Sequence, residues 1–237
     1  MIIQDITLNN VGYVVDSIPF NSIGALLYVD AGNKASYPGT GTTWTDLSAN
    51  ANNATLVNSP GYTASPGYFT FSGTGYQYAS TTASKFNTAY TGKTVFVAAR
   101  MTAVIAGTFR CLFGTNSGTR NFNTYIYSPS SGVYQIHYSA GAGGGFSNNL
   151  SLTTNQWFIA AVTHTSGGLV SYYFNGQPVG TNAGLTFIQY SNNNGEYVAL
   201  GDNYWYGDIG VCAVYGRALS STEILQNFSS LAPRYGL

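Results

Sequence analysis

Charged side chains are scarce in this sequence of 237 residues, where Asp, Glu, Lys and Arg together make up 7%. An ordinary soluble domain carries about 25%. The eight cations balance the eight anions, so the sequence offers no basic stripe of the kind that displaces counterions from phosphates. We therefore expect no nucleic-acid partner. Near-zero net charge also removes the repulsion between neighbouring copies, which favours a protein that assembles, most simply as a homo-oligomer.

Long apolar runs are absent as well. No stretch of about 18 apolar residues occurs, so no membrane-spanning segment is predicted. The first residues lack the basic region and apolar run of a secretory signal, and we expect synthesis in a cytoplasm. The two cysteines, Cys111 and Cys212, lie in strand-like segments. We interpret them as buried thiols in a reducing compartment, with a disulfide as the alternative.

Residues that break bonds are few. His137 and His164 both lie in strand patterns, and no G-x-S-x-G nucleophile turn occurs. Glycoside hydrolysis generally needs two carboxyl groups about 5–9.5 Å apart, yet no acid-x-acid pair exists and Glu223 belongs to a helix cap. Asp202 and Asp208 are the only acids that a loop could bring together. We predict that the protein is not an enzyme, and glycoside hydrolase is the less favoured alternative.

Short apolar-alternating runs recur between clusters of Gly, Asn, Ser and Pro, and this is typical of a sandwich built from many strands. The sequence holds 20 Tyr and 13 Phe residues, which favour strands over helices. We therefore predict a single-domain, all-β sandwich. The clearest strands are expected at 25–30, 68–72, 94–101, 110–114, 123–127, 133–138, 157–165, 170–174, 197–200 and 207–215.

Two of these runs carry more detail. Residues 94–101 are apolar on both faces, which predicts a central strand covered on each side. Asn175-Gly176 follows the run 170–174 and is a strong signal for a type I′ turn, because both central residues must adopt positive φ. Residues 168–180 are therefore predicted to form a hairpin.

One short helix is expected near the C-terminus. Ser220 and Glu223 form a capping box, in which each side chain accepts a backbone N–H of the other residue. Pro233 is expected to end the helix, and we expect the helix to close one end of the sandwich. Its apolar face is formed by Ile224, Leu225, Phe228 and Leu231.

The first 24 residues hold too many apolar groups for a solvated tail. Two interpretations remain open for residues 1–24: edge strands of the sandwich, or an arm that pairs with a neighbouring subunit by strand addition and is ordered only there. Residues 25–237 form the sandwich domain.

A sugar site needs an aromatic platform flanked by amide and hydroxyl groups, because sugars present apolar faces ringed by hydroxyls. The best local candidate combines aromatic and Asn side chains near the end of the chain. The alternative, which we favour, is that Trp205 and its neighbouring tyrosines pack against the sandwich or a subunit. The candidate carbohydrate-binding residues are Tyr190, Asn203, Tyr204, Trp205 and Tyr206, with residues 192–194 beside them.

No cofactor is expected, and no His/Cys cluster with zinc-ligand spacing occurs. Calcium requires several carboxylates and carbonyls that converge on one point. Asp30, Asp46 and Asp208 are the candidates, each with Gly or Asn nearby. Turn capping is the alternative function for the same three side chains.

Several segments, in their order and spacing over residues 25–231, resemble the laminin G-like branch of the concanavalin A-like lectin/glucanase fold. The resemblance implies a two-sheet antiparallel jelly roll. The glucanase E-x-D-x-E motif is missing, and Gly210 stands where many members carry an acid, which weakens the case for a family calcium site. The matching segments are 44–56 (WTDLSANANNATL), 71–76 (FSGTGY), 157–163 (WFIAAVT), 173–176 (YFNG), 207–209 (GDI), 214–220 (VYGRALS) and 223–224 (EI).

Two further segments, 28–41 and 228–237, are similar to versions found in tailed-phage virion proteins. This resemblance implies a non-enzymatic surface protein of a bacteriophage virion, either a capsid decoration (cement) protein or a head or tail fibre. The expected partners are the major capsid protein or tail proteins, and the expected location is the virion, after synthesis in the host cytoplasm. The alternative function is a glycan-binding lectin module for host attachment.

Overall fold

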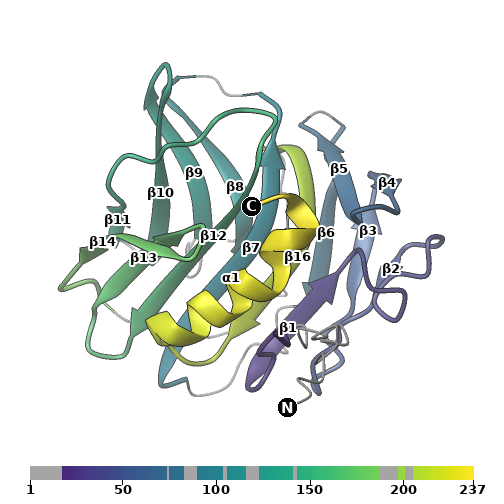
Figure 1. Cartoon of the computed structure of the whole chain (residues 1–237), viewed down its shortest axis with the longest axis horizontal. Helices are drawn as coiled ribbons and strands as arrows, with labels where there is room; N and C mark the ends of the chain where they lie inside the picture. Colours follow the sequence, from purple (N-terminus) through teal and green to yellow (C-terminus); the bar gives the residue numbers. More distant parts are fainter. Residues whose placement is uncertain are drawn as a thin grey trace, which may run out of the picture.

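The structure is a computed structural model, and it consists of two antiparallel sheets packed face to face with one helix on the outside (Figure 1). This confirms the predicted all-β sandwich with one short C-terminal helix. Among the described residues, no helix has the length and apolarity needed to cross a membrane. The structure describes residues 18–73, 75–82, 90–103, 106–115, 123–140, 143–186, 197–200 and 205–237.

Sheet A has eight strands in the order β14-β13-β12-β7-β16-β5-β4, and β1 also pairs with β16. The first half of β16 pairs with β5 and its second half with β1, so these two strands follow one another along one edge of β16. The strands are β1 (Ala25–Asp30), β4 (Gly61–Thr63), β5 (Tyr68–Ser72), β7 (Gly92–Met101), β12 (Trp157–Thr165), β13 (Val170–Phe174), β14 (Gln177–Asn182) and β16 (Tyr206–Tyr215).

Sheet B also has eight strands, in the order β11-β10-β9-β8-β15-β6-β3-β2. The sequence pattern missed β2, β3, β4, β6 and β11, because these strands are short or consist mostly of Gly, Ala, Ser and Thr. The strands of sheet B are β2 (Thr43–Trp44), β3 (Ala54–Val57), β6 (Tyr78–Thr82), β8 (Thr108–Thr115), β9 (Asn123–Ser130), β10 (Val133–Ala140), β11 (Gly143–Phe146) and β15 (Tyr197–Leu200).

Sheet A is buried on both faces. Along β7, Val95 and Val97 point into the main core between the two sheets. Phe96 and Ala98 point the other way, into a second core beneath the helix. Strands β12 and β16 alternate in the same manner. The prediction that residues 94–101 form a strand covered on each side is thus confirmed.

Helix α1 (Ser221–Tyr235) begins with the predicted capping box, in which the Glu223 amide donates to the Ser220 hydroxyl and the Glu223 carboxylate accepts the Ser220 amide. The prediction that Pro233 ends the helix is wrong. Because Pro233 lies in the last turn, it removes one helical hydrogen bond only. The helix continues to Tyr235, and Gly236 closes it in the left-handed conformation with φ 70°.

The helix also lies in a different place from the one predicted. It crosses the outer face of sheet A, in front of β7 and β16, and does not close an end of the sandwich (Figure 1). Leu225 points away from the sheet and is 44% exposed, whereas Asn227 is fully buried. The helical spacing of the apolar residues does not reveal whether the helix packs on a sheet or on an end of the sandwich. The buried residues of α1 are Ile224, Asn227, Leu231, Ala232 and Tyr235.

The predicted hairpin is confirmed as β13 and β14, joined by the turn Asn175-Gly176. Both turn residues have positive φ, 48° for Asn175 and 75° for Gly176. The Asn175 side-chain oxygen also accepts the backbone N–H of Ile159 at 2.9 Å, which ties the turn to β12.

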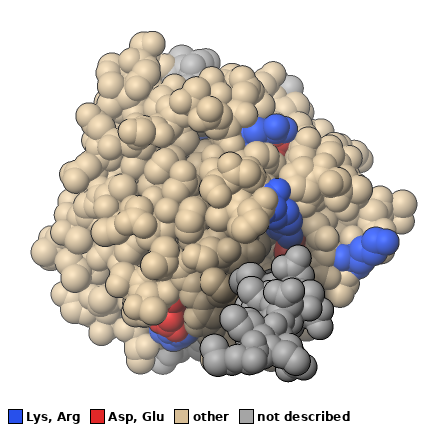
Figure 2. Space-filling view, viewed as in Figure 1, with Lys and Arg blue, Asp and Glu red and all other residues tan. Residues whose placement is uncertain are grey.

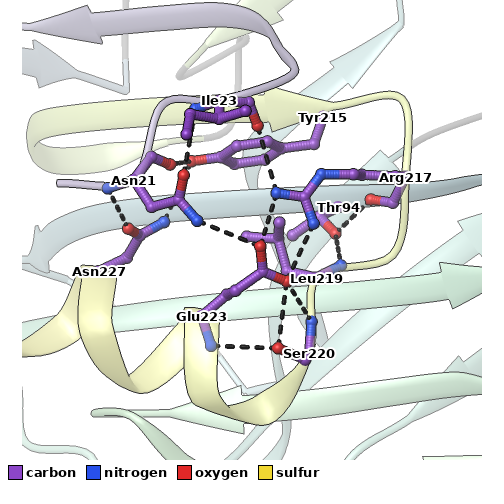
Figure 3. A network of polar contacts seen from close by, with 9 residues as sticks. All are labelled: Asn21, Ile23, Thr94, Tyr215, Arg217, Leu219, Ser220, Glu223 and Asn227. Atoms are coloured by element: carbon purple, nitrogen blue, oxygen red, sulfur yellow. Dashed lines mark hydrogen bonds and ion pairs between the residues drawn. The ribbon is translucent and has the colours of Figure 1, made fainter.

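Residues 18–24 are held by the chain's own domain (Figure 3). The backbone N–H of Asn21 donates to Asn227 Oδ1 at 2.7 Å, and its carbonyl accepts the Tyr215 hydroxyl. The Asn21 side chain donates to Glu223. Residues 18–24 therefore form no strand and contact the chain's own sandwich, whereas the expectation for residues 1–24 as a whole stays a prediction. Residues 1–17 lie outside the described residues.

Candidate functional site

Trp205 is not an exposed member of the predicted sugar platform. The Trp205 side chain is 0% exposed and lies in the main core, with its ring centroid 6.4 Å from that of Phe158. Trp205 is therefore the packed residue of the alternative interpretation. Tyr206 follows it, points the other way and is 40% exposed. Tyr190, Asn203 and Tyr204 lie outside the described residues, as do residues 192–194.

Asp46 organises a turn, as the capping interpretation expects. Its carboxylate accepts the backbone N–H groups of Tyr28, Ser48 and Asn52 at 2.8–2.9 Å and the Ser48 hydroxyl at 2.7 Å. These four donors come from β1 and from the loop after β2. Asp46 therefore joins the two sheets at this end.

Asp208 and Asp30 are each paired with an arginine. Asp208 accepts Arg100 Nε at 2.6 Å and the Thr70 hydroxyl at 2.6 Å. Asp30 accepts Arg234 Nη1 at 2.9 Å. The three candidate calcium ligands thus contact different protein donors, and the described residues include no group of three or more His, Cys, Asp or Glu that could hold a metal. Asp202 lies outside the described residues.

Gly210 stands where many members of the resembled family carry an acid, and the structure explains part of this difference. A Cβ atom at Gly210 would collide with the Tyr235 hydroxyl oxygen, which occupies this position from the end of α1. An acid at position 210 would displace the last turn of the helix. The glycine therefore belongs with the packing of α1 on sheet A.

His164 is a buried residue of β12. It is 1% exposed, and its Nδ1 lies 3.2 Å from the Tyr138 hydroxyl while Nε2 lies 3.3 Å from the Leu185 carbonyl oxygen. Burial lowers the pKa of His164, so the imidazole is neutral at pH 7. Beside it, burial lowers the pKa of Lys93 to about 7. Both cysteines are present as buried thiols, and burial raises the pKa of Cys212.

A group of aromatic rings, partly exposed among the described residues, lies on the outer face of sheet B, on the side of the molecule opposite α1. We call it the aromatic cluster. It spans four neighbouring strands, from β8 to β11. Its members are Phe109, Tyr125, Tyr127, His137 and Phe146.

Strand register brings these rings together. Phe109 on β8 lies opposite Tyr127 on β9, and His137 on β10 lies opposite both Tyr125 and Phe146. Because side chains alternate between the faces of a strand, the intervening residues point into the main core. The cluster therefore follows from the same period-two pattern that builds the core.

The rings are in contact and partly exposed. Phe109 stacks on Tyr127 with centroids 4.4 Å apart, and His137 lies 4.4 Å from Phe146 and 5.0 Å from Phe109. Phe109 and Phe146 are each 39% exposed. Tyr125 is half-buried like the other members. A surface of this kind offers flat apolar area with phenol and imidazole groups at its margin.

Neutral polar groups lie beside the cluster. Gln135 Nε2 donates to Asn149 Oδ1 at 3.2 Å, and Asn123 Nδ2 donates to the Tyr125 hydroxyl. Gly144 is exposed, and a Cβ atom there would stand 2.8 Å from His137 Nε2. Any side chain at position 144 would therefore crowd the imidazole of His137.

The ion pairs of the described residues lie on the other side of the molecule. Arg100–Asp208, Arg217–Glu223 and Arg234–Asp30 all lie on the outer side of sheet A or at the ends of α1. Figure 2 shows this face, where small charged patches interrupt a surface that is otherwise uncharged. Arg110 follows Phe109 in β8 but pairs with Ile126, a core residue, so it points away from the aromatic cluster.

Two eight-stranded antiparallel sheets, closed by a helix on one side and open on the other, define a lectin-type sandwich. The family described as concanavalin A-like lectin/glucanases superfamily matches residues 71–225, more than half of the chain. The chain belongs to this family, and the resemblance found in the sequence is confirmed at that level. A search of curated proteins finds no match.

Solved structures of similar fold include a Trypanosoma rangeli sialidase in complex with sialic acid, with a TM-score of 0.64 and 15% identity over 91% of this chain and 34% of the sialidase chain. The binding domain of botulinum neurotoxin DC in complex with SialylT gives a TM-score of 0.62 and 15% identity over 88% of this chain and 52% of that chain. The same domain in complex with rat synaptotagmin II gives 0.64 and 15% over 89% and 52%. This chain therefore spans about a third to a half of these chains, and at this identity the likeness shows the fold alone.

Proposed function

We propose that this chain is a non-catalytic carbohydrate-binding domain and that the aromatic cluster is its binding surface. The observation that carries the proposal is the group of five contacting rings on the outer face of sheet B, of which Phe109 and Phe146 are each 39% exposed among the described residues. Sugars present apolar C–H faces ringed by hydroxyls, so a flat aromatic surface with neutral polar groups at its margin suits them. Gln135, Asn149 and the Tyr127 phenol lie in that margin.

The acids of the described residues support a binding function over hydrolysis. Asp30, Asp208 and Glu223 are each engaged by an arginine, and Asp46 caps a turn. Hydrolysis by the common route needs one acid that can give up a proton and a second that acts as base or nucleophile. These four carboxylates are already engaged by groups of the protein itself, so none of them is placed as such a pair.

The comparisons support carbohydrate as the class of ligand to test. The sialidase was determined with sialic acid and the neurotoxin binding domain with SialylT. Because the second domain was also determined with rat synaptotagmin II, a protein ligand is the outcome that would replace our proposal.

The setting that we propose is the surface of a tailed-phage virion, where the domain would decorate the capsid or form part of a fibre and bind glycans of the host. Segments 28–41 and 228–237 and the low charge support this setting. The major capsid protein, tail proteins and further copies of the chain are the proposed partners. Mass spectrometry of purified particles from a lysate that encodes the chain checks this: its peptides should co-purify with the particles, and their absence contradicts the setting.

A glycan array tests the binding function. The array should include neutral and sialylated glycans together with bacterial surface polysaccharides. The wild-type chain is expected to bind at least one class, and Phe109→Ala and Phe146→Ala are expected to weaken that binding at least about fivefold, since each removes an exposed ring contact.

Two matched variants separate this site from the rest of the surface. Leu225→Ala removes an exposed apolar side chain on α1, on the opposite face, and should leave binding unchanged. Tyr206→Ala tests the described exposed member of the sequence-predicted site. Loss of binding in Tyr206→Ala with no change in Phe109→Ala would move the site to the start of β16, and no glycan binding by the wild type would overturn the proposal.

A further inference from the structure

The rings of the aromatic cluster converge on a small area. Phe109 on β8 and Phe146 on β11 come from the two outermost strands of the cluster, yet their ring centroids lie only 6.5 Å apart. His137 contacts both rings, with centroids 5.0 Å from Phe109 and 4.4 Å from Phe146. These separations are those of rings in direct contact. The apolar surface that the cluster offers is therefore about as wide as one sugar ring.

The cluster is closed along one side. Beyond Tyr125 on β9, the next residue on the outer face is Asn123, which is 5% exposed. Ser139 lies opposite Asn123 on β10 and is 6% exposed. On β8, Cys111 lies opposite Tyr125 and is 2% exposed. These three side chains are buried although they lie on the outer face of sheet B, so a ligand on the cluster cannot extend over them.

The opposite side of the cluster, towards the hairpin that joins β9 and β10, is open. Tyr127 on β9 is half-buried, and Pro129 and Ser130 at the end of the strand are exposed. On β10, Gln135 is half-buried, and its amide donates to Asn149 in an exposed contact. A sugar unit on the cluster can therefore be linked to further units on the hairpin side, where the surface is exposed and polar.

From this geometry we propose that the aromatic cluster recognises a single sugar unit at the end of a glycan chain or branch, and that the rest of the glycan leaves over the hairpin between β9 and β10. The inference rests on the proposed carbohydrate-binding function and adds the part of the ligand that is bound. A unit in the interior of a linear chain carries a neighbour at both ends. A terminal unit carries one neighbour, which fits a surface of one ring's width with one side closed and the opposite side open.

The dependence of affinity on glycan length is the first test. The probes are the terminal monosaccharide of the glycan with the strongest array signal, as its methyl glycoside, and fragments of two to six units that keep the same terminal unit. Calorimetry with the wild-type chain should give dissociation constants that agree within about threefold over the series, because units beyond the first gain no ring contact. A greater rise in affinity with length would overturn the inference, since further units would then be contacted.

Removal of the terminal unit is the second test. An exoglycosidase that cleaves only this unit, from a fragment whose second unit differs from the first, should lower the affinity at least about tenfold. Phe109→Ala and Phe146→Ala should weaken the binding of the monosaccharide and of the longest fragment by the same factor, because both rings contact the one bound unit. Leu225→Ala, on α1 at the opposite face, is the matched control and should change neither affinity.

The outcomes separate the two hypotheses. Binding that is retained after removal of the terminal unit would reject recognition of a terminal unit while carbohydrate binding stands. A loss in Phe146→Ala that is larger for the longest fragment than for the monosaccharide would do the same. If a folded wild-type chain binds no glycan of the array and none of the fragments, the carbohydrate-binding function itself is rejected. Circular dichroism and the thermal midpoint of each variant confirm that the fold is retained.

Discussion

The two outer faces of the sandwich differ sharply. The outer face of sheet A is closed by α1, which buries a second core that contains Phe96 and Tyr173. The ion pairs of the described residues also lie on this side. The outer face of sheet B carries similar residue types, yet Phe109 and Phe146 there are 39% exposed. Phenylalanine thus packs in a core on one face and remains partly exposed on the other.

The N-terminal segment strengthens the contrast. Phe20 stacks on Tyr28 with centroids 4.5 Å apart and contacts Phe96 edge-on at 5.6 Å, so residues 18–24 extend the cover over sheet A. Asn21 and Asn227 then tie this segment to the helix. The polar network and the helix thus lie on one face, and under our proposal the difference between the faces separates stability from binding.

Truncating a phenylalanine on each face should give the largest difference in the free energy of unfolding. Phe96→Ala removes a fully buried ring and is expected to cost about 3–5 kcal/mol in the free energy of unfolding. Phe146→Ala removes a partly exposed cross-strand ring and should cost less than about 1 kcal/mol. Urea unfolding followed by fluorescence measures both values. Equal losses would mean that the aromatic cluster is a structural core, and the contrast between the faces would be lost.

Removing a polar side chain from each face should give a smaller difference in the free energy of unfolding. Asn227 is 0% exposed, accepts the Asn21 N–H at 2.7 Å and donates to the Tyr215 hydroxyl at 3.1 Å. Asn227→Ala leaves both groups without this partner and should cost about 2 kcal/mol. The control is Gln135→Ala beside the aromatic cluster, which should cost less than about 0.5 kcal/mol. A larger effect at Gln135 would contradict the assignment of the polar network to the α1 face.

The smallest effect on the free energy of unfolding is expected from a change of pH that titrates Glu223. Arg217 contacts both carboxylate oxygens of Glu223, at 2.7 and 2.9 Å, and this lowers the pKa of Glu223 to about 2. The folded pKa lies below the unfolded value of about 4.3, so the stabilisation is present above pH 4.3 and is lost as the pH falls towards 2. Because the pair is partly exposed, we expect at most about 1 kcal/mol.

The measurement for this effect is the difference in unfolding free energy between wild type and Glu223→Gln at several pH values. The difference should be largest near pH 6 and should shrink between pH 4 and pH 2. A difference that stays constant over this range would show that the charge of Glu223 contributes nothing to the attachment of α1.

Much of the fold could be predicted, because period-two alternation and turn signals are local. Residues 157–165 and 170–174 were expected as strands and are strands with the same bounds, and the Asn175-Gly176 turn follows directly from φ preference. Strand β11 has the sequence Gly-Gly-Gly-Phe, which carries no alternation, so no local signal reveals it. The position of α1 depends on which surface accepts its apolar face, and this is a property of the assembled sheet.

The candidate site was harder to predict, because it depends on register. Tyr125, His137 and Phe146 are far apart in the sequence and become neighbours only when β9, β10 and β11 pair. Trp205 was a candidate sugar-binding residue because other aromatic residues lie close to it in the sequence. Tyr206 faces outward, and the residue before it faces the opposite side of the sheet. The indole of Trp205 therefore points into the main core. Local composition therefore pointed to a tryptophan that is buried, while Tyr190, Asn203 and Tyr204 of the same predicted site lie outside the described residues.

Chemical-shift mapping tests the central claim most directly, that the face of sheet B binds carbohydrate while the face of sheet A serves stability. Labelled protein is titrated with the glycan that gives the strongest array signal, and amide shifts are followed residue by residue. We predict that the perturbed amides lie in β8 to β11 around Phe109, His137 and Phe146. Perturbations confined to α1 and residues 18–24, with none in β8 to β11, would contradict it.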